Sequence, residues 1–401
     1  MASGPNTRLL LQAGAMVLFL LTSCLAEMTE EQLKAMEAMN LKHMLKDEIK
    51  LVEKDARRQG PRKFSDGEGT TPDQQNFSHP YHKPGIVDEI RYSYRRYREM
   101  IFLKAGKFWM GTNDPESPTG EYPMKQVPVK SFYLDANPVI NADYWAFRAT
   151  KKFVRSEAEK KGWSWVVDMF LSDETRDYYS MPGPRGWAAV KKATWDKPEG
   201  PDSNLEERWA HPVVHLSWYD AKQYCEFHGK RLPTEPEWEY AARAGVQSEA
   251  YPWGDNWERQ RANLWQGDWP YENRKADGYA MTSPVDAYRP QNLIGFYDMI
   301  GNVWEWTLSA YVERMVQHHL QTSMVVLKGG SYVDSVTGKI NQPVRNGQRM
   351  GQKQDYTSAN IGFRCAKSAP EFDKAAEEAA TTTEAPRKKG RKFHLKKKEE
   401  L

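Results

Sequence analysis

The stretch that decides the fold is Gly301-Asn302-Val303-Trp304-Glu305-Trp306, in which two tryptophans stand beside a glycine and an asparagine. The same texture extends from about residue 100 to residue 368. Most of the chain's fifteen tryptophans lie there among Gly, Asn, Asp and Pro. Loop-forming residues at this density favour short strands and long structured loops over a helical bundle.

Helices in this region are few and well marked. Residues 217–228 predict one helix. The segment Thr234-Glu235-Pro236-Glu237 opens another, because Thr234 can accept a hydrogen bond from the first turn while Glu237 reaches back, as in a capping box. Gly245 is placed to end this second helix.

The compact region, taken as residues 99–368, is long enough to form one domain. Residues 27–98 predict an N-terminal extension, in which an amphipathic helix between residues 28 and 58 precedes a linker rich in Gly, Pro, Asp and Gln. A helix that packs on its own core is favoured over one that binds a partner. Residues 369–401 offer almost no bulky apolar side chain, so we expect a disordered basic tail.

The two ends of the chain predict its compartment. Residues 1–26 have the layout of a secretory signal peptide, with Arg8 before an apolar run over residues 9–21 that is too short to span a bilayer. The chain ends in a variant of an endoplasmic reticulum retrieval signal, formed by Lys398, Glu399, Glu400 and Leu401. We therefore expect a protein of the endoplasmic reticulum lumen without a membrane span, and a simple exposed acidic ending is the alternative.

Three cysteines are present, and Cys24 leaves with the predicted signal peptide. In an oxidising compartment Cys225 and Cys365 then predict a disulfide, against the alternative of two buried free thiols. Asn76-Phe77-Ser78 is an acceptor sequence for N-glycosylation. The formal net charge is only +3, and most of the basic excess lies in the tail, so nucleic-acid binding is not expected.

Six blocks occur in one order along the compact region. They are FWMGT (108–112), HPVVHLSW (211–218), GKRLPTE (229–235), YPWG (251–254), GNVWEW (301–306) and IGFRC (361–365). Together they resemble the formylglycine-generating enzyme family of sulfatase-modifying factors. The resemblance implies an α+β fold that is related to the C-type lectins, low in regular secondary structure, and stabilised by calcium and disulfides.

Active members of that family oxidise a cysteine of nascent sulfatases to formylglycine, with molecular oxygen and a Cu(I) ion held by two cysteines. The resemblance places the first of these at Asp334, after the segment KGGSY (328–332), and the second near Lys339. No cysteine lies between Cys225 and Cys365, so the soft ligands of copper are missing and no copper is expected. The chain is similar to inactive members of the family.

The resemblance also implies two structural calcium sites. In the first site, Asn263 and Asp277 would supply side-chain oxygens, and Leu264 and Tyr279 would supply main-chain carbonyl oxygens. In the second site, Asp298 and Glu305 would supply carboxylates, and Gly301 and Val303 would supply main-chain carbonyl oxygens. Calcium binds several hard oxygen ligands in irregular geometry, which suits a looped backbone. Without the resemblance, these residues would be interpreted as turn formers and loop caps.

A peptide groove is the last feature that the resemblance implies, with Trp304, Ser331, Arg349 and Asn360 around it. An extended peptide could lie there with main-chain hydrogen bonds and one anchored side chain. Core packing is the alternative for Trp304, and an ion pair with a neighbouring carboxylate is the alternative for Arg349. Two histidines, at 211 and 215, are too few for a metal site.

Three functions follow for comparison. The leading hypothesis is a pseudoenzyme that lacks the two active-site cysteines, binds sulfatases or the active formylglycine-generating enzyme, and dampens sulfatase activation. The second is an enzyme using Asp334 and Lys339 as an acid and base pair. The third is a calcium-dependent lectin-like module, for which kinship of fold is weak support. A homodimer stays open.

Overall fold

The computed structural model describes residues 99–373, apart from residues 118, 152–153, 245–249, 259, 312–323 and 340. The predicted signal peptide, N-terminal extension, Asn76 acceptor site and retrieval signal lie outside the described residues, as does the predicted basic tail from residue 374 onward. The first residues of that predicted tail, 369–373, are described and pack on the domain: Ala369 is 0% exposed, and its N–H donates to the Ser131 carbonyl oxygen at 3.0 Å. Among the residues that are described, no helix combines the length and the apolar character that a membrane span requires.

Strands form four small sheets rather than one large one. The central sheet has the order β10-β9-β8-β11, with bounds Arg349–Lys353, Met324–Lys328, Trp304–Ala310 and Ile361–Gly362. A second has the order β1-β4-β12, with bounds Met100–Leu103, Phe132–Asp135 and Ala366–Ser368. A third has the order β5-β7-β6, with bounds Trp163–Val167, Trp187–Lys191 and Ser180–Pro182. The fourth pairs β2 (Gly106–Met110) with β3 (Lys125–Val129).

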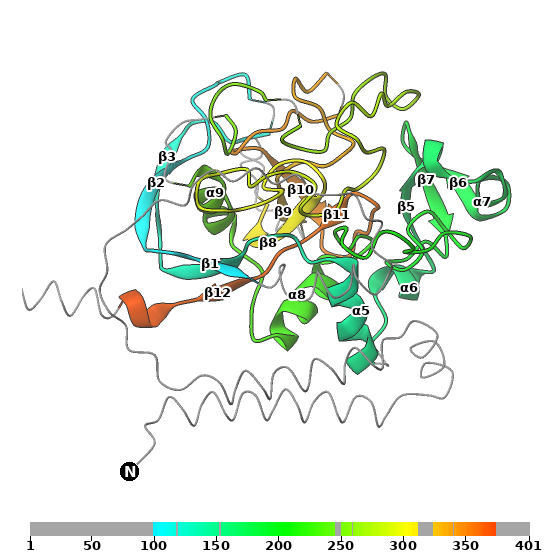
Figure 1. Ribbon diagram of the computed structural model, residues 1–401, viewed down its shortest axis with the longest axis horizontal. Coiled ribbons are helices and arrows are strands. Elements are labelled where there is room, and N and C mark those ends of the chain that lie inside the picture. Colours follow the sequence, from blue (N-terminus) through cyan, green and yellow to red (C-terminus); the bar gives the residue numbers. More distant parts are fainter. Residues whose placement is uncertain are drawn as a thin grey trace, which may run out of the picture.

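Short helices surround these sheets. They are α5 (Asn141–Thr150), α6 (Glu157–Lys161), α7 (Asp173–Tyr179), α8 (Trp218–Phe227) and α9 (Glu235–Arg243), with a 3₁₀ turn at Asp168–Phe170. Helix α9 contacts β2, β3, β8 and β9. Figure 1 shows β8 and β9 in the middle of the molecule, with β2 and β3 at one end and the β5-β7-β6 sheet with α7 at the other. The α+β class with few helices is confirmed.

The predicted helix starts are confirmed at atomic detail. Ser217 caps α8 and Thr234 caps α9, and each forms a complete capping box with the acidic residue three positions later. Helix α9 ends at Arg243, and Ala244 adopts the left-handed conformation there, one residue before the predicted Gly245. Gly245 itself lies outside the described residues.

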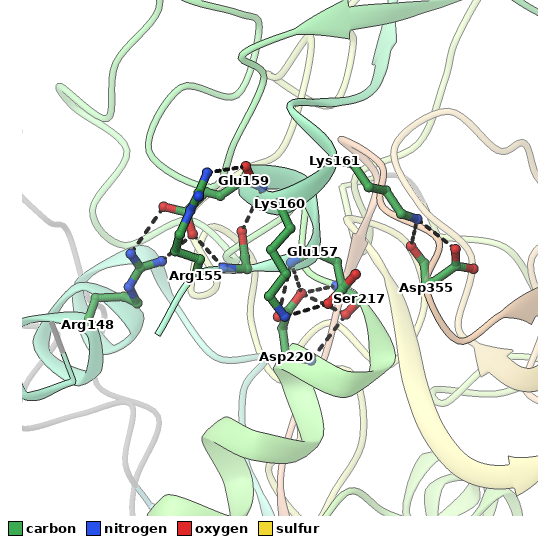
Figure 2. A network of polar contacts seen from close by, with 10 residues as sticks. Arg148, Arg155, Glu157, Glu159, Lys160, Lys161, Ser217, Asp220 and Asp355 are labelled. Atoms are coloured by element: carbon green, nitrogen blue, oxygen red, sulfur yellow. Dashed lines mark hydrogen bonds and ion pairs between the residues drawn. The ribbon is translucent and has the colours of Figure 1, made fainter. Parts of the chain in front are cut away.

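A network of charged groups joins α5, α6 and α8 (Figure 2). The Glu159 carboxylate of α6 accepts hydrogen bonds from Arg148 of α5 at 2.6 and 3.1 Å. The Asp220 carboxylate of α8 accepts from its own cap, Ser217, and from the backbone N–H of Glu157 at 3.1 Å. One side chain therefore caps its own helix and binds the start of another, which fixes how these helices meet.

The stretch that opened the sequence analysis forms the centre of the core. Trp304 and Trp306 of β8 are 1% and 0% exposed, in the apolar cluster that also holds Cys225 and Cys365. The two cysteines form the predicted disulfide, with 5.6 Å between their Cα atoms. It links α8 to the segment between β11 and β12, so the core is cross-linked across 140 residues of sequence.

Candidate functional site

The turn that follows β9 depends on two glycines. Gly329 and Gly330 both have positive φ angles, of 98° and 75°. A Cβ atom at Gly329 would lie 2.8 Å from the Met299 carbonyl oxygen, and one at Gly330 would lie 2.6 Å from a methyl of Val344. Only glycine fits this backbone, which turns the chain so that Ser331 and Asp334 face each other.

Asp334, where the resemblance puts the first active-site cysteine, is held by several donors. Its Oδ2 atom accepts hydrogen bonds from the Ser331 backbone N–H at 2.8 Å and from the Ser331 hydroxyl at 2.7 Å. Its Oδ1 atom accepts from the Gln342 backbone N–H at 3.0 Å, and the Trp304 indole also donates to the carboxylate. Burial raises the pKa of Asp334 to about 6, although these donors oppose the shift.

The structure brings together three of the four predicted groove residues around this carboxylate. The Asn360 amide donates to the Ser331 hydroxyl at 3.1 Å, and Asn360 accepts from the Ser358 hydroxyl at 2.7 Å. We call Trp304, Ser331, Asp334 and Asn360 the Asp334 network. Its members are between 0% and 7% exposed, so little of their surface is open to a peptide. Their groove role stays a prediction.

Arg349, the fourth predicted groove residue, is in an ion pair. Its guanidinium contacts the Glu235 carboxylate at 2.9 and 3.1 Å, as the alternative interpretation of this residue expected. It also lines a cavity of about 310 Å³, together with Glu121, Glu235 and Glu239. The structure therefore places this side chain beside a cavity of mixed charge.

Lys339, the predicted second cysteine position, does not join Asp334. Its side chain is exposed, and no ion pair links its ammonium group to Asp334 within the described part of the chain. The carboxylate already accepts four hydrogen bonds. The proposed acid and base pair is therefore not assembled in this structure.

The residues of the first predicted calcium site share one loop region. The Asp277 carboxylate accepts from the backbone N–H groups of Leu264 and Tyr279 at 2.9 and 3.1 Å. Asn263 is 1% exposed, and its side-chain oxygen is buried without a hydrogen-bond partner among the described residues. A buried hard oxygen with no donor fits a calcium ligand, so the residues present fit this ion.

The second predicted calcium site is dominated by buried charge. The Glu305 carboxylate accepts from the Arg364 guanidinium at 2.7 Å through each of its oxygens. Asp298 is 4% exposed, and burial raises its pKa to about 8. Arg364 donates only to the main-chain carbonyl oxygen of Asp298, at 3.2 Å, and the Asp298 carboxylate accepts from the Asn302 amide at 2.7 Å. A divalent cation beside this buried carboxylate would favour its charged form, so the residues present fit calcium.

Calcium itself stays a prediction at both sites. Within the described ranges, no three His, Cys, Asp or Glu side chains cluster as metal ligands. The predicted sites do not depend on such a cluster, because each combines side-chain oxygens with two backbone carbonyls.

The two histidines of the HPVVHLSW block differ in exposure: His215 is buried, whereas His211 is half-buried, with a ring nitrogen 3.0 Å from the Thr282 hydroxyl. His215 is fully buried, with one ring nitrogen 2.8 Å from the Ser164 hydroxyl and the other 2.8 Å from the Pro198 carbonyl oxygen. Burial lowers the pKa of His211 to about 3 and that of His215 to about 4. Both rings are therefore neutral at physiological pH, and the His215 ring serves as a hydrogen-bonded part of the core.

Buried ion pairs are the feature that the sequence analysis missed. Arg364 is 0% exposed and pairs with Glu305, although it was visible only as part of the IGFRC block. Lys328 is also 0% exposed and binds Glu239 at 3.0 Å, which Arg243 contacts at 2.8 Å. The signal that could have predicted these pairs is a charged residue within an otherwise apolar or glycine-rich motif, as Glu305 is in GNVWEW, Arg364 in IGFRC and Lys328 in KGGSY.

Comparisons with known proteins agree with the resemblance. Residues 88–369 match the family model described as "Sulfatase-modifying factor enzyme 1-like domain". "Inactive C-alpha-formylglycine-generating enzyme 2" of Bos taurus is 45% identical over 272 residues, covering 67% of this chain and 88% of the relative. "Formylglycine-generating enzyme" of Mus musculus is 38% identical over 314 residues, covering 74% and 82%. The solved structure of PvdO from Pseudomonas aeruginosa has 24% identity and a TM-score of 0.48, covering 68% and 95%.

Proposed function

The chain belongs to the family of sulfatase-modifying factor enzyme 1-like domains. From that premise we propose that it is a catalytically inactive member of this family and that it resides in the lumen of the endoplasmic reticulum. It binds sulfatases or the active formylglycine-generating enzyme and dampens sulfatase activation. The observation that carries this proposal is the buried Asp334 carboxylate, which occupies the position expected for the first copper-binding cysteine.

The lack of thiolate ligands at this site supports the absence of oxidase activity. Cu(I) is a soft ion that takes thiolate ligands, whereas the Asp334 oxygens are hard donors already bound to protein N–H and O–H groups. The cysteines of the described chain, Cys225 and Cys365, are both 0% exposed and joined in a disulfide. Neither supplies a thiolate unless that cross-link in the core is broken.

The named relatives support the binding half of the proposal. One is called inactive and another is called formylglycine-generating enzyme, and this chain is similar to both over most of their lengths. A scaffold that keeps the family fold but carries a carboxylate at the catalytic position can bind the same polypeptides without converting them. Two structural calcium ions, at the sites described above, complete this proposal.

The test is oxidation of a Cys-x-Pro-x-Arg peptide in copper and oxygen, followed by mass spectrometry. We expect no formylglycine from this chain, turnover by the mouse enzyme as the positive control, and slower turnover when this chain is added in excess. An Asp334→Cys, Lys339→Cys variant restores two sulfur positions, and we expect it to bind Cu(I) where the natural chain does not. Turnover by the natural chain, or unchanged turnover of the mouse enzyme at saturation, would refute the proposal.

A second candidate rests on the pKa of Asp334, because a carboxylic acid with a pKa of about 6 suits general acid and base catalysis. The geometry gives it less support, since the carboxylate is 2% exposed and Lys339 does not reach it. An activity that disappears in an Asp334→Ala protein would favour this candidate. Calcium-dependent binding on a glycan array would instead favour a lectin-like module.

A further inference from the structure

A cavity of about 250 Å³ lies beside β1, and none of its lining residues belongs to the Asp334 network. Glu99 and Asp286 supply its two carboxylates. Neither forms an ion pair or a side-chain hydrogen bond with any residue that the structure describes. Two carboxylates without partners in one cavity create a negative potential inside it.

The described part of the lining supplies no cation to balance this charge. Among the described residues that line the cavity, none is Lys, Arg or His. Arg364 reaches the carbonyl oxygens of Ala136 and Tyr297, which belong to two lining residues, at 3.0 and 2.8 Å. Its charge is already neutralised by Glu305, at 2.7 Å. The cavity therefore favours a positively charged occupant.

The same lining contains a buried acceptor. Asn137 is 3% exposed, and its side-chain oxygen has no hydrogen-bond partner among the described residues. A buried acceptor without a donor is costly to the folded protein, and a ligand that brings an N–H group would reduce that cost.

The rest of the lining is apolar. Ile101, Ile294 and Tyr297 offer a surface on which a hydrocarbon chain can pack. Outside the cavity, Leu293 is 97% exposed and Ile294 is 41% exposed. Exposed apolar side chains at the edge of a charged cavity are typical of a protein interaction site, where they exclude water from the central contact.

We propose that this cavity is a docking site for an arginine or lysine side chain of a partner protein. The aliphatic stem of the partner's residue packs on Ile101 and Ile294, as long basic side chains do on apolar surface. The charged head lies between Glu99 and Asp286. Leu293 contacts the partner's neighbouring residues, which favours a polypeptide over a free amine. This interaction surface goes beyond the proposed function and does not use Asp334.

Fluorescence anisotropy of a labelled Ala-Leu-Arg-Leu-Ala peptide with the full chain tests the assignment. A matched peptide carries citrulline, which keeps the shape of arginine and lacks its charge. We expect the citrulline peptide to bind at least about tenfold more weakly, because charge-assisted hydrogen bonds contribute that much. Added salt should weaken binding of the arginine peptide, because it screens the attraction between the charges. Equal binding of the two peptides would overturn the proposal.

Protein variants locate the binding. Glu99→Gln with Asp286→Asn should weaken the arginine peptide about tenfold or more, and Ile294→Ser at the exposed rim should also weaken it. Glu174→Gln is the matched control, because Glu174 is exposed on α7, well away from β1 in Figure 1. Thermal unfolding checks that each variant is folded.

Two results would reassign or reject the site. If both the double variant and Ile294→Ser, each folded, bind as tightly as the natural chain, the peptide does not use this cavity. If a chain ending at residue 373 binds the peptide far more tightly than the full chain, the basic tail of the same chain is the occupant and the partner assignment is wrong. Neither result bears on the oxidation test at Asp334.

Discussion

Replacing Asp334 by asparagine removes the charge of a buried carboxyl group and keeps its size. In the folded chain the pKa of Asp334 is raised from 3.8 to about 6, chiefly by burial. Between these two pH values the folded chain holds a proton that the unfolded chain has released. Raising the pH through this window therefore favours unfolding of the natural protein and leaves the asparagine variant unaffected at this site.

The magnitude follows from the two pKa values. The difference between 3.8 and about 6 corresponds to about 3 kcal/mol of unfolding free energy. We expect the natural chain to lose about that much relative to Asp334→Asn between about pH 4 and about pH 7. In the asparagine variant an NH2 group faces the Gln342 N–H, so two donors oppose each other and one buried hydrogen bond is lost. This lowers the unfolding free energy of the variant by about 1 to 3 kcal/mol at every pH.

The assay is urea unfolding of both proteins across this pH range with the disulfide intact. The difference between their unfolding free energies is the quantity to plot against pH. Asp355→Asn is the matched control, because its hydrogen bond to Lys161 lowers the pKa of the exposed Asp355 below 3.8. The difference for this control should therefore stay nearly flat between about pH 4 and about pH 7, and change with the opposite sign only at lower pH. A difference for Asp334→Asn that stays flat, or that favours the natural chain as pH rises, would refute the reasoning.

Three further results are expected. Cys225→Ser with Cys365→Ser should lower the unfolding free energy by up to about 5 kcal/mol in urea, since the bridge closes 140 residues of sequence; an unchanged midpoint would contradict this. Lys328→Met should cost about 3 to 5 kcal/mol in the same assay, because Glu239 loses a buried partner, whereas Lys222→Met on the surface should cost less than about 1 kcal/mol. Calcium should raise the thermal midpoint of the natural chain and raise that of Asn263→Ala less; equal shifts would remove Asn263 from the first site.

Several features of this chain could be predicted from the sequence because each depends on few residues. The capping boxes at Ser217 and Thr234 involve groups within one helical turn, so their spacing is sufficient evidence. The disulfide followed from having only Cys225 and Cys365 outside the predicted signal peptide. Family membership followed from the order of six short blocks, which needs no knowledge of contacts.

Other features depend on which distant segments meet, and only the tertiary structure decided them. The sequence placed Asp334 at the catalytic position, but the donors from Trp304 and Gln342 and the burial that raises its pKa come from folding. Likewise, Glu99 and Asp286 are far apart in the chain and line one cavity only in the fold. Local spacing encodes the start of a helix, whereas desolvation and charge pairing depend on the whole surroundings of a side chain, which no short pattern specifies.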